Sequence, residues 1–210
     1  MGIATDSHWK LIERLSPMAF LAAGVLLLGH AAVLGIQAFT DMATPIDVFA
    51  PVGHLLALVG LVGLYPVFAD RTPRLARAGV VLAAVVAVGW AAVTLSIVGT
   101  SLGGSSPQTE ALLGILSIVV LSSTILPYTL FGVAVLRTHV ARRAAGFLLL
   151  TPAILLTVLL VNIAILGASL LDGVVVGTGL ALATLTIGFT LWAGRIPTPR
   201  PSSNGDVTPG

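Results

Sequence analysis

The sequence predicts an all-α integral membrane protein, in which six transmembrane helices form a compact bundle and both termini lie in the cytoplasm. Three observations predict this class. Of the 210 residues, 57% are hydrophobic and only 9% are charged, whereas soluble domains carry about 25% charged residues. The apolar residues form six long blocks, none of which contains Asp, Glu, Lys or Arg. All ten Lys and Arg residues fall into alternate gaps between the blocks, as topology signals do.

Each block is long enough to cross a bilayer as a helix, which takes about 20 residues. The first follows Ser16-Pro17 and is longer than the apolar run of a signal peptide, and no small-x-small cleavage site stands out, so we expect it to be retained. The second contains Pro51 near its start, where proline suits the first helical turn. The predicted spans are residues 17–38, 49–69, 78–99, 111–136, 145–168 and 173–194.

Turn residues separate the later blocks. Pro73 and Gly79 mark the break before the third block, and the Gly-Gly-Ser-Ser-Pro segment 103–107 precedes the fourth. A basic turn, 137–144, precedes the fifth, and Asp172-Gly173 separates the last two. Glycine, proline and serine are the residues that punctuate helical patterns in this way.

The charges predict the orientation of the bundle. Basic residues occupy the first, third, fifth and seventh gaps, and the other gaps contain acids alone. The positive-inside rule therefore places both termini in the cytoplasm, which agrees with an even number of spans. The basic residues are Lys10, Arg14, Arg71, Arg74, Arg77, Arg137, Arg142, Arg143, Arg195 and Arg200.

Two end segments flank the transmembrane domain, residues 17–194. For the cytoplasmic segment 1–16 two interpretations are open: a short interfacial helix over residues 3–15, with Trp9 and Ile12 on its lipid side, or a frayed terminus. The segment 195–210 is rich in Pro, Ser, Gly and Thr, which predicts a disordered cytoplasmic tail.

Several classes of chemistry find no support in the sequence. The chain has no cysteine, so it has no disulfide, thiol nucleophile or Cys-ligated metal. It also lacks Gly-x-Ser-x-Gly, His-Glu-x-x-His, Walker and dinucleotide-binding motifs. The basic residues are divided among short segments and form no continuous patch, so we expect no nucleic-acid partner. We expect no enzymatic activity and no cofactor.

Polar side chains inside the apolar blocks are the candidate functional residues, since such groups are costly in lipid. The strongest lie within about 4–8 Å of the membrane midplane, on its outer side, counting 1.5 Å per helical residue. Two interpretations are open. These residues line a cavity open to the outside, with Asp41 and Asp47 at its mouth, or each bonds a neighbouring backbone separately. The residues are His30, His54, Thr94 and Asn162.

A metal or haem site is a further hypothesis for the histidines, since imidazole suits both. Two histidines do not complete a zinc site, however, and a bis-histidine haem needs His30 and His54 to face each other across the porphyrin. We rank this hypothesis last.

Backbone features add two expectations. Pro127 lies within the fourth block and removes one helical hydrogen bond, which predicts either a hinge near the midplane or a static kink. Small residues at spacing four, such as Gly173 and Gly177, or Ala31 and Gly35, allow close approach of helices. This pattern favours a compact bundle and is compatible with a homo-oligomer.

The segment Val135 to Leu150, with its basic turn, resembles the cytoplasmic turns of uncharacterised small prokaryotic membrane proteins, as does Leu64-Tyr65-Pro66 leading to Arg71. The resemblance implies a six-helix fold and no known activity, and we separately expect a multi-pass protein of the cell membrane. The resemblance carries over no functional residue.

The leading hypothesis for function is a non-enzymatic accessory or scaffold subunit, whose helices pack in the lipid bilayer with another membrane protein or a second copy. Short loops and the absence of charged residues from the spans favour it. The alternative is a small-solute transporter or channel that uses the outer polar layer. A membrane-embedded haem or metal-binding protein is the second alternative.

Overall fold

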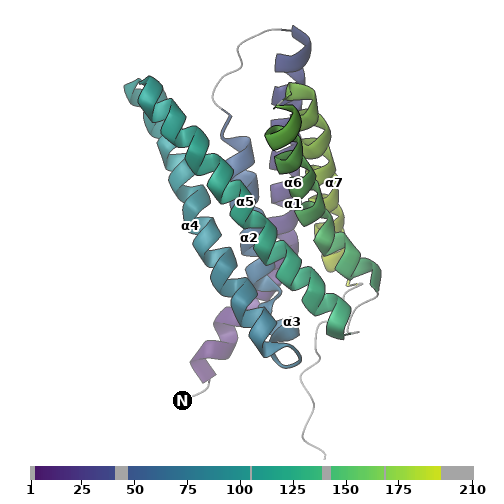
Figure 1. Cartoon of the computed structure of the whole chain (residues 1–210). Coiled ribbons are helices and arrows are strands. Elements are labelled where there is room, and N and C mark those ends of the chain that lie inside the picture. The colour runs from purple at the N-terminus through teal and green to yellow at the C-terminus, as the bar shows by residue number, and fades with distance from the viewer. Residues whose placement is uncertain (1–2, 41–46, 105, 139–142, 168, 195–210) are drawn as a thin grey trace, which may run out of the picture.

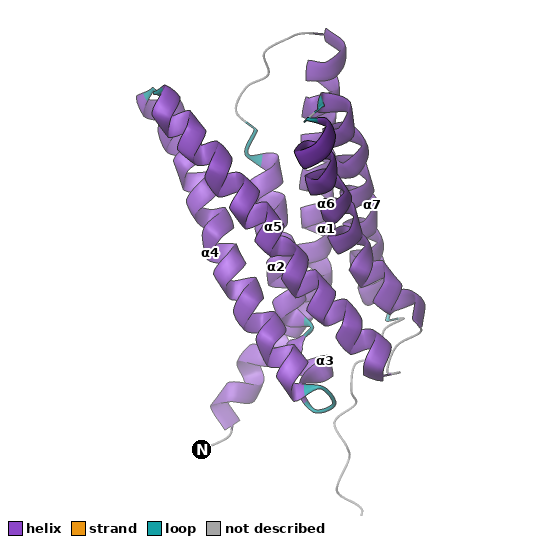
Figure 2. Ribbon diagram, in the orientation of Figure 1, coloured by secondary structure: helices purple, strands orange, loops and turns teal. Residues whose placement is uncertain are grey.

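The chain folds entirely into α-helices, as a computed structural model shows (Figure 1). The structure describes residues 3–40, 47–104, 106–138, 143–167 and 169–194, and for residues 3–14, 138 and 143 it describes the backbone only. No strand occurs within these ranges (Figure 2). The helices are α1 (Ile3–Thr40), α2 (Phe49–Gly63), α3 (Tyr65–Ala69), α4 (Pro73–Gly103), α5 (Pro107–Thr138), α6 (Arg143–Leu166) and α7 (Leu170–Trp192).

Five of these helices are long and apolar enough to cross a membrane. They are α1, α4, α5, α6 and α7, whereas α2 has 15 residues. The outward faces of these helices carry large apolar side chains, among them Val88 at 71% exposed and Val175 at 71%. A surface of this kind needs lipid around it. The chain is therefore an integral membrane protein.

The predicted second span, 49–69, is two helices rather than one. Pro66 has no backbone N–H to donate to the carbonyl of Val62, and a proline ring clashes with the carbonyl four residues earlier. The backbone tightens at this point, where the N–H of Leu64 donates to the Leu61 carbonyl at 3.0 Å and the N–H of Val67 to the Leu64 carbonyl at 3.1 Å. The proline thus separates α2 from α3.

The first helix also differs from its prediction in length. It runs without interruption from Ile3 to Thr40 and includes Pro17. The segment 3–16 is therefore helical and continuous with the helix that follows. Its location at a membrane interface stays a prediction, and the tail 195–210 lies outside the described residues.

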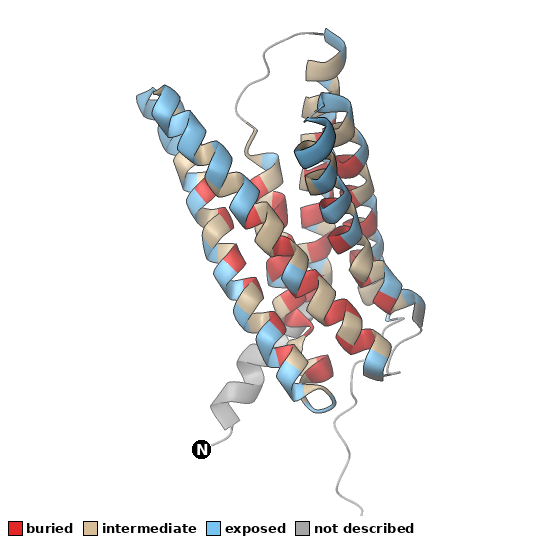
Figure 3. Cartoon of the chain, viewed as in Figure 1, coloured by how far each residue is buried: buried red, intermediate tan, exposed pale blue. Residues whose placement is uncertain are grey.

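Six helices form a closed ring. Neighbours in the ring are α1 and α2, α2 and α4, α4 and α5, α5 and α6, α6 and α7, and finally α7 and α1. Buried residues gather on the inward faces of these helices (Figure 3). The largest fully buried side chains are Tyr128, Phe20, Phe68 and Phe131. The short α3 packs mainly against α4 at the lower end of the bundle in Figure 1.

The first and last helices make the most extensive contact, and glycines permit it. A Cβ atom at Gly24 of α1 would lie 2.9 Å from the backbone nitrogen of Leu185. A Cβ atom at Gly188 of α7 would lie 2.9 Å from the backbone nitrogen of Leu21. Both distances are too short for a real Cβ, so α1 and α7 approach closely because neither position has a side chain.

Candidate functional site

A cavity of about 280 Å³ lies inside the ring and is bordered by α1, α2, α4, α5, α6 and α7. Most of its wall is apolar. Polar groups come from a few residues only, which are His30, Asp47, His54, Trp90 and Ser117. Ligand sites have this composition, with an apolar wall and a small number of placed polar groups.

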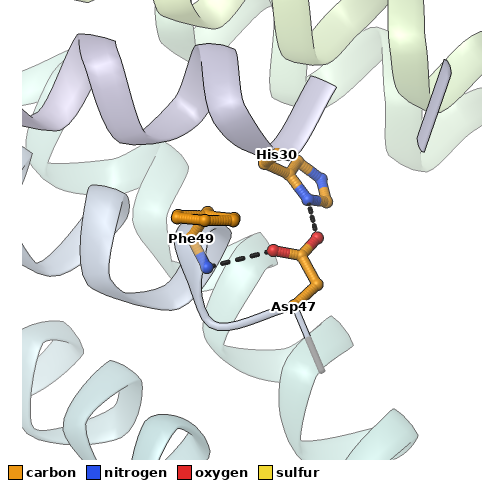
Figure 4. Close-up of polar contacts among 3 residues, drawn as sticks. All are labelled: His30, Asp47 and Phe49. Atoms are coloured by element: carbon orange, nitrogen blue, oxygen red, sulfur yellow. Dashed lines mark hydrogen bonds and ion pairs between the residues drawn. The ribbon is translucent and has the colours of Figure 1, made fainter. Parts of the chain in front are cut away.

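His30 and Asp47 form one polar group of the cavity. Nδ1 of His30 on α1 contacts Oδ2 of Asp47, which precedes α2 (Figure 4). The other carboxylate oxygen, Oδ1, accepts a hydrogen bond of 3.0 Å from the backbone N–H of Phe49. The carboxylate thus satisfies a free N–H at the start of α2 and ties that helix to α1.

The environment of Asp47 favours its ionised form. Partial burial acts to raise the pKa of this carboxyl group, but the hydrogen bond and charge of His30, with the N–H groups of Phe49 and Ala50, outweigh it. The pKa of Asp47 is therefore below its usual value of 3.8. Hydrogen bonds to an ionised carboxylate are the physical cause of this direction.

His54 and Trp90 form the second polar group. The two rings are stacked with their centroids 4.6 Å apart and their planes 12° apart. Trp90 is held in place because its Nε1–H donates to Oγ1 of Thr124 at 2.9 Å. The Thr124 hydroxyl in turn donates to the Val120 carbonyl at 2.8 Å. This buried chain of contacts fixes α2, α4 and α5 relative to one another.

The ring nitrogens of His54 remain available to a ligand. The residue is only 5% exposed, and the described residues give its ring no hydrogen-bond partner. Among those residues no fully enclosed side-chain nitrogen or oxygen lacks a partner. The nitrogens of His54 therefore border the cavity that this residue lines.

The structure brings only two of the four predicted polar residues together in the cavity wall. His30 and His54 line the cavity together, whereas Thr94 and Asn162 are not part of its wall. The Thr94 hydroxyl donates to the Trp90 carbonyl of its own helix at 2.8 Å, and Asn162 is half-buried on α6. Asp47, predicted at the mouth of the cavity, is part of its wall and pairs with His30. Asp41, predicted at the mouth as well, lies outside the described residues.

Pro127, the predicted hinge, lies buried inside α5, which continues on both sides of it. Its hinge role stays a prediction. The predicted close approach at small residues occurs at Gly177, where a Cβ would contact Ala31 at 3.4 Å. At Gly35 no neighbouring atom lies within 4 Å of such a Cβ.

A metal centre finds no support in the part of the chain that the structure describes, where no three His, Asp or Glu side chains come close enough to hold an ion. Comparison with protein-family models, with curated proteins and with solved structures finds no match. The geometry of the cavity is therefore the basis for assigning a function.

Sequence reasoning missed Trp90 and Ser117. A signal for Trp90 was present, because its indole N–H lies well inside an apolar block rather than near the membrane interface, where tryptophan is usual. Buried indole N–H groups generally find a hydrogen-bond partner, so Trp90 could have been included among the candidate polar residues. Ser117 carried no such signal, since serines recur throughout α5.

Proposed function

We propose that this membrane protein binds a small solute in the cavity between its helices and acts as a binding or transport protein for it. One observation carries the proposal. His54, a buried imidazole to which the described residues give no hydrogen-bond partner, borders a cavity that also contains the paired His30 and Asp47. Unpaired polar groups are costly inside a membrane protein, and a ligand would satisfy this one.

We further propose six spans in the cell membrane, with α2 and α3 together forming the sixth. The two helices cover residues 49–69, which at 1.5 Å per residue gives about 30 Å, the thickness of the hydrocarbon core. The turn between α3 and α4, which contains Arg71, lies at the same lower end of the bundle as the N-terminus (Figure 1). The positive-inside rule makes that end cytoplasmic.

Labelling of single cysteines tests this topology directly, because the natural chain contains none. Asp70→Cys is at the proposed inner end, and Gln108→Cys, at the start of α5, is at the proposed outer end. A membrane-impermeant maleimide added to intact cells should label Gln108→Cys and leave Asp70→Cys unlabelled until the cells are opened. Labelling of Asp70→Cys alone would reverse the orientation.

The binding function is tested by comparing what co-purifies with three forms of the protein. Ser117→Phe places a ring in the cavity, whereas Ser122→Phe makes the same change on α5 at a position that does not line it. Small molecules extracted from the purified proteins would be quantified by mass spectrometry. We expect at least one compound to be enriched with the wild type and Ser122→Phe and depleted from Ser117→Phe. Equal profiles for all three proteins would refute the proposal.

The accessory or scaffold role expected from the sequence stays a prediction. That role requires exposed apolar helix faces for a partner to contact, and the long helices have them. Lipid covers such faces as well as a partner protein does, however. The cavity, by contrast, has chemistry that lipid-facing surfaces do not need.

A further inference from the structure

We propose that the ligand is an uncharged amphiphile, with an apolar chain and a hydroxyl or carbonyl head, that enters the cavity sideways from the membrane between α5 and α6. This inference rests on the proposed binding function and adds the chemical class of the ligand and its route. Three observations support it: the placement of the polar groups, the separation of α5 from α6, and the bonding state of the polar residues.

The polar groups and the lipid-facing side of the cavity lie on opposite walls. His30 belongs to α1 and His54 to α2. In the ring of six helices, the pair α1 and α2 is opposite the pair α5 and α6. The wall formed by α5 and α6 contributes the apolar residues Ile118, Leu121, Leu156 and Leu159, with Ser117 as its polar member. A ligand with its head at the histidines would therefore have its tail directed toward α5 and α6.

The helices α5 and α6 pack closely at the end that carries the basic turn. Near the basic turn, a Cβ at Gly132 would meet Leu150 at 2.6 Å, and one at Gly146 would meet Leu136 at 2.6 Å. Toward the other end the two helices diverge (Figure 1).

The exposure of side chains where α5 and α6 diverge agrees with an opening of the cavity between these two helices. Ile115 of α5 is 62% exposed and Ile165 of α6 is 73% exposed. Ile118, which lines the cavity, is itself 49% exposed. The cavity thus reaches the surface beside α5, in the half of the bundle that we place in the outer leaflet. An apolar tail can leave it there without meeting water.

The bonding of the polar residues favours an uncharged head. The described residues of the cavity wall include no Lys or Arg, and His30 is already paired with Asp47, so a carboxylate or phosphate head finds no unpaired positive charge there. Both oxygens of Asp47 are engaged, with His30 and with the Phe49 N–H, so a cationic head finds no free carboxylate among the described residues of the wall. His54 remains, and a neutral imidazole offers one donor and one acceptor. A hydroxyl or carbonyl oxygen matches it.

Three photoreactive probes with the same alkyl chain and a diazirine in the tail test the head group. They carry a primary alcohol, a carboxylate or a quaternary ammonium, and are added to proteoliposomes of the full chain. We expect the alcohol to label peptides of α5 and α6 about 3–10-fold more than either charged probe, the effect of about one hydrogen bond. Equal labelling by the three probes, or preference for a charged one, would overturn the inference.

Variants at His54 test the role of its nitrogens. His54→Phe keeps an aromatic ring against Trp90 and should lower labelling by the alcohol probe about 3–10-fold. His54→Gln retains a donor and an acceptor and should recover labelling relative to His54→Phe. Unchanged labelling in a correctly folded His54→Phe protein would overturn the inference.

Variants on the lipid-facing side test the route, even if changes at His54 prevent folding. Ile118→Trp would obstruct the opening, whereas Ile36→Trp makes the same change on α1, at a position equally exposed at 49% that does not line the cavity. Only the first should slow labelling. If Ser117→Phe loses a co-purifying compound that is charged or without an apolar chain, the proposed ligand class is wrong and the proposed binding function is supported. If no compound is lost and no probe is preferred, both fail.

Discussion

Replacement of Gly24 by alanine should destabilise the bundle by forcing α1 away from α7. The added Cβ would lie 2.9 Å from the backbone nitrogen of Leu185, roughly 0.5 Å inside ordinary van der Waals contact. A backbone atom cannot rotate aside as a side chain can, so the two helices must separate. Overpacking of this kind costs about 1–3 kcal/mol, which exceeds the gain of about 1 kcal/mol in helix propensity from glycine to alanine.

Gly35→Ala is the matched control, because it makes the same change in the same helix at a position with no neighbouring atom within 4 Å. Thermal unfolding in one detergent, followed by tryptophan fluorescence, would compare the two variants. For a chain of this size, 1 kcal/mol corresponds to about 2–4 °C, so Gly24→Ala should unfold several degrees below the wild type and Gly35→Ala at or above it. If Gly24→Ala matched Gly35→Ala, the close approach of α1 and α7 would be refuted.

Thr124→Val should lower the unfolding temperature, because the indole N–H of Trp90 loses its buried acceptor, at a cost of about 0.5–2 kcal/mol. Thr186→Val, whose hydroxyl bonds only its own helix, should leave that temperature nearly unchanged. The lowered pKa of Asp47 means that the ionised carboxylate stabilises the fold above about pH 4 and that this contribution is lost as the pH falls further. A pH series of unfolding temperatures should show the loss in the wild type and its absence in Asp47→Asn. Pro66→Ala restores a backbone donor and should slow amide hydrogen exchange between α2 and α3 about fivefold; unchanged exchange would contradict the assigned cause of the break.

The membrane class and most helix positions could be predicted because they depend on local composition. Apolar blocks without charge define five of the long helices, and the loops fall where the basic and glycine-rich segments do. The break at Pro66 was less accessible, since proline near the end of an apolar block is compatible with a kink, a break or the end of a helix. The surrounding backbone decided among them.

The site could be predicted only in part. The depth of a residue in the membrane follows from its position along its own helix, whereas the direction of its side chain depends on how that helix packs against others. Counting residues placed His30 and His54 in one layer on the outer side of the midplane, and the structure brings both to one cavity. The same counting included Thr94 and Asn162, whose helices direct them elsewhere. Which face of a helix points inward depends on its neighbours in the ring, and hence on contacts such as those at Gly24 that a single sequence does not reveal.

The contact between α1 and α7 joins two helices that are synthesised far apart in time. The ribosome delivers α1 well before α7, yet these two helices share the most extensive contact among the described elements. Until α7 has entered the membrane, the face of α1 that contains Gly24 has no helix to pack against, and the cavity lined by His30 and His54 has no wall on that side. A chain that stops before α7 would leave the ring open between α1 and α6, so the cavity is enclosed only once α7 has joined the bundle.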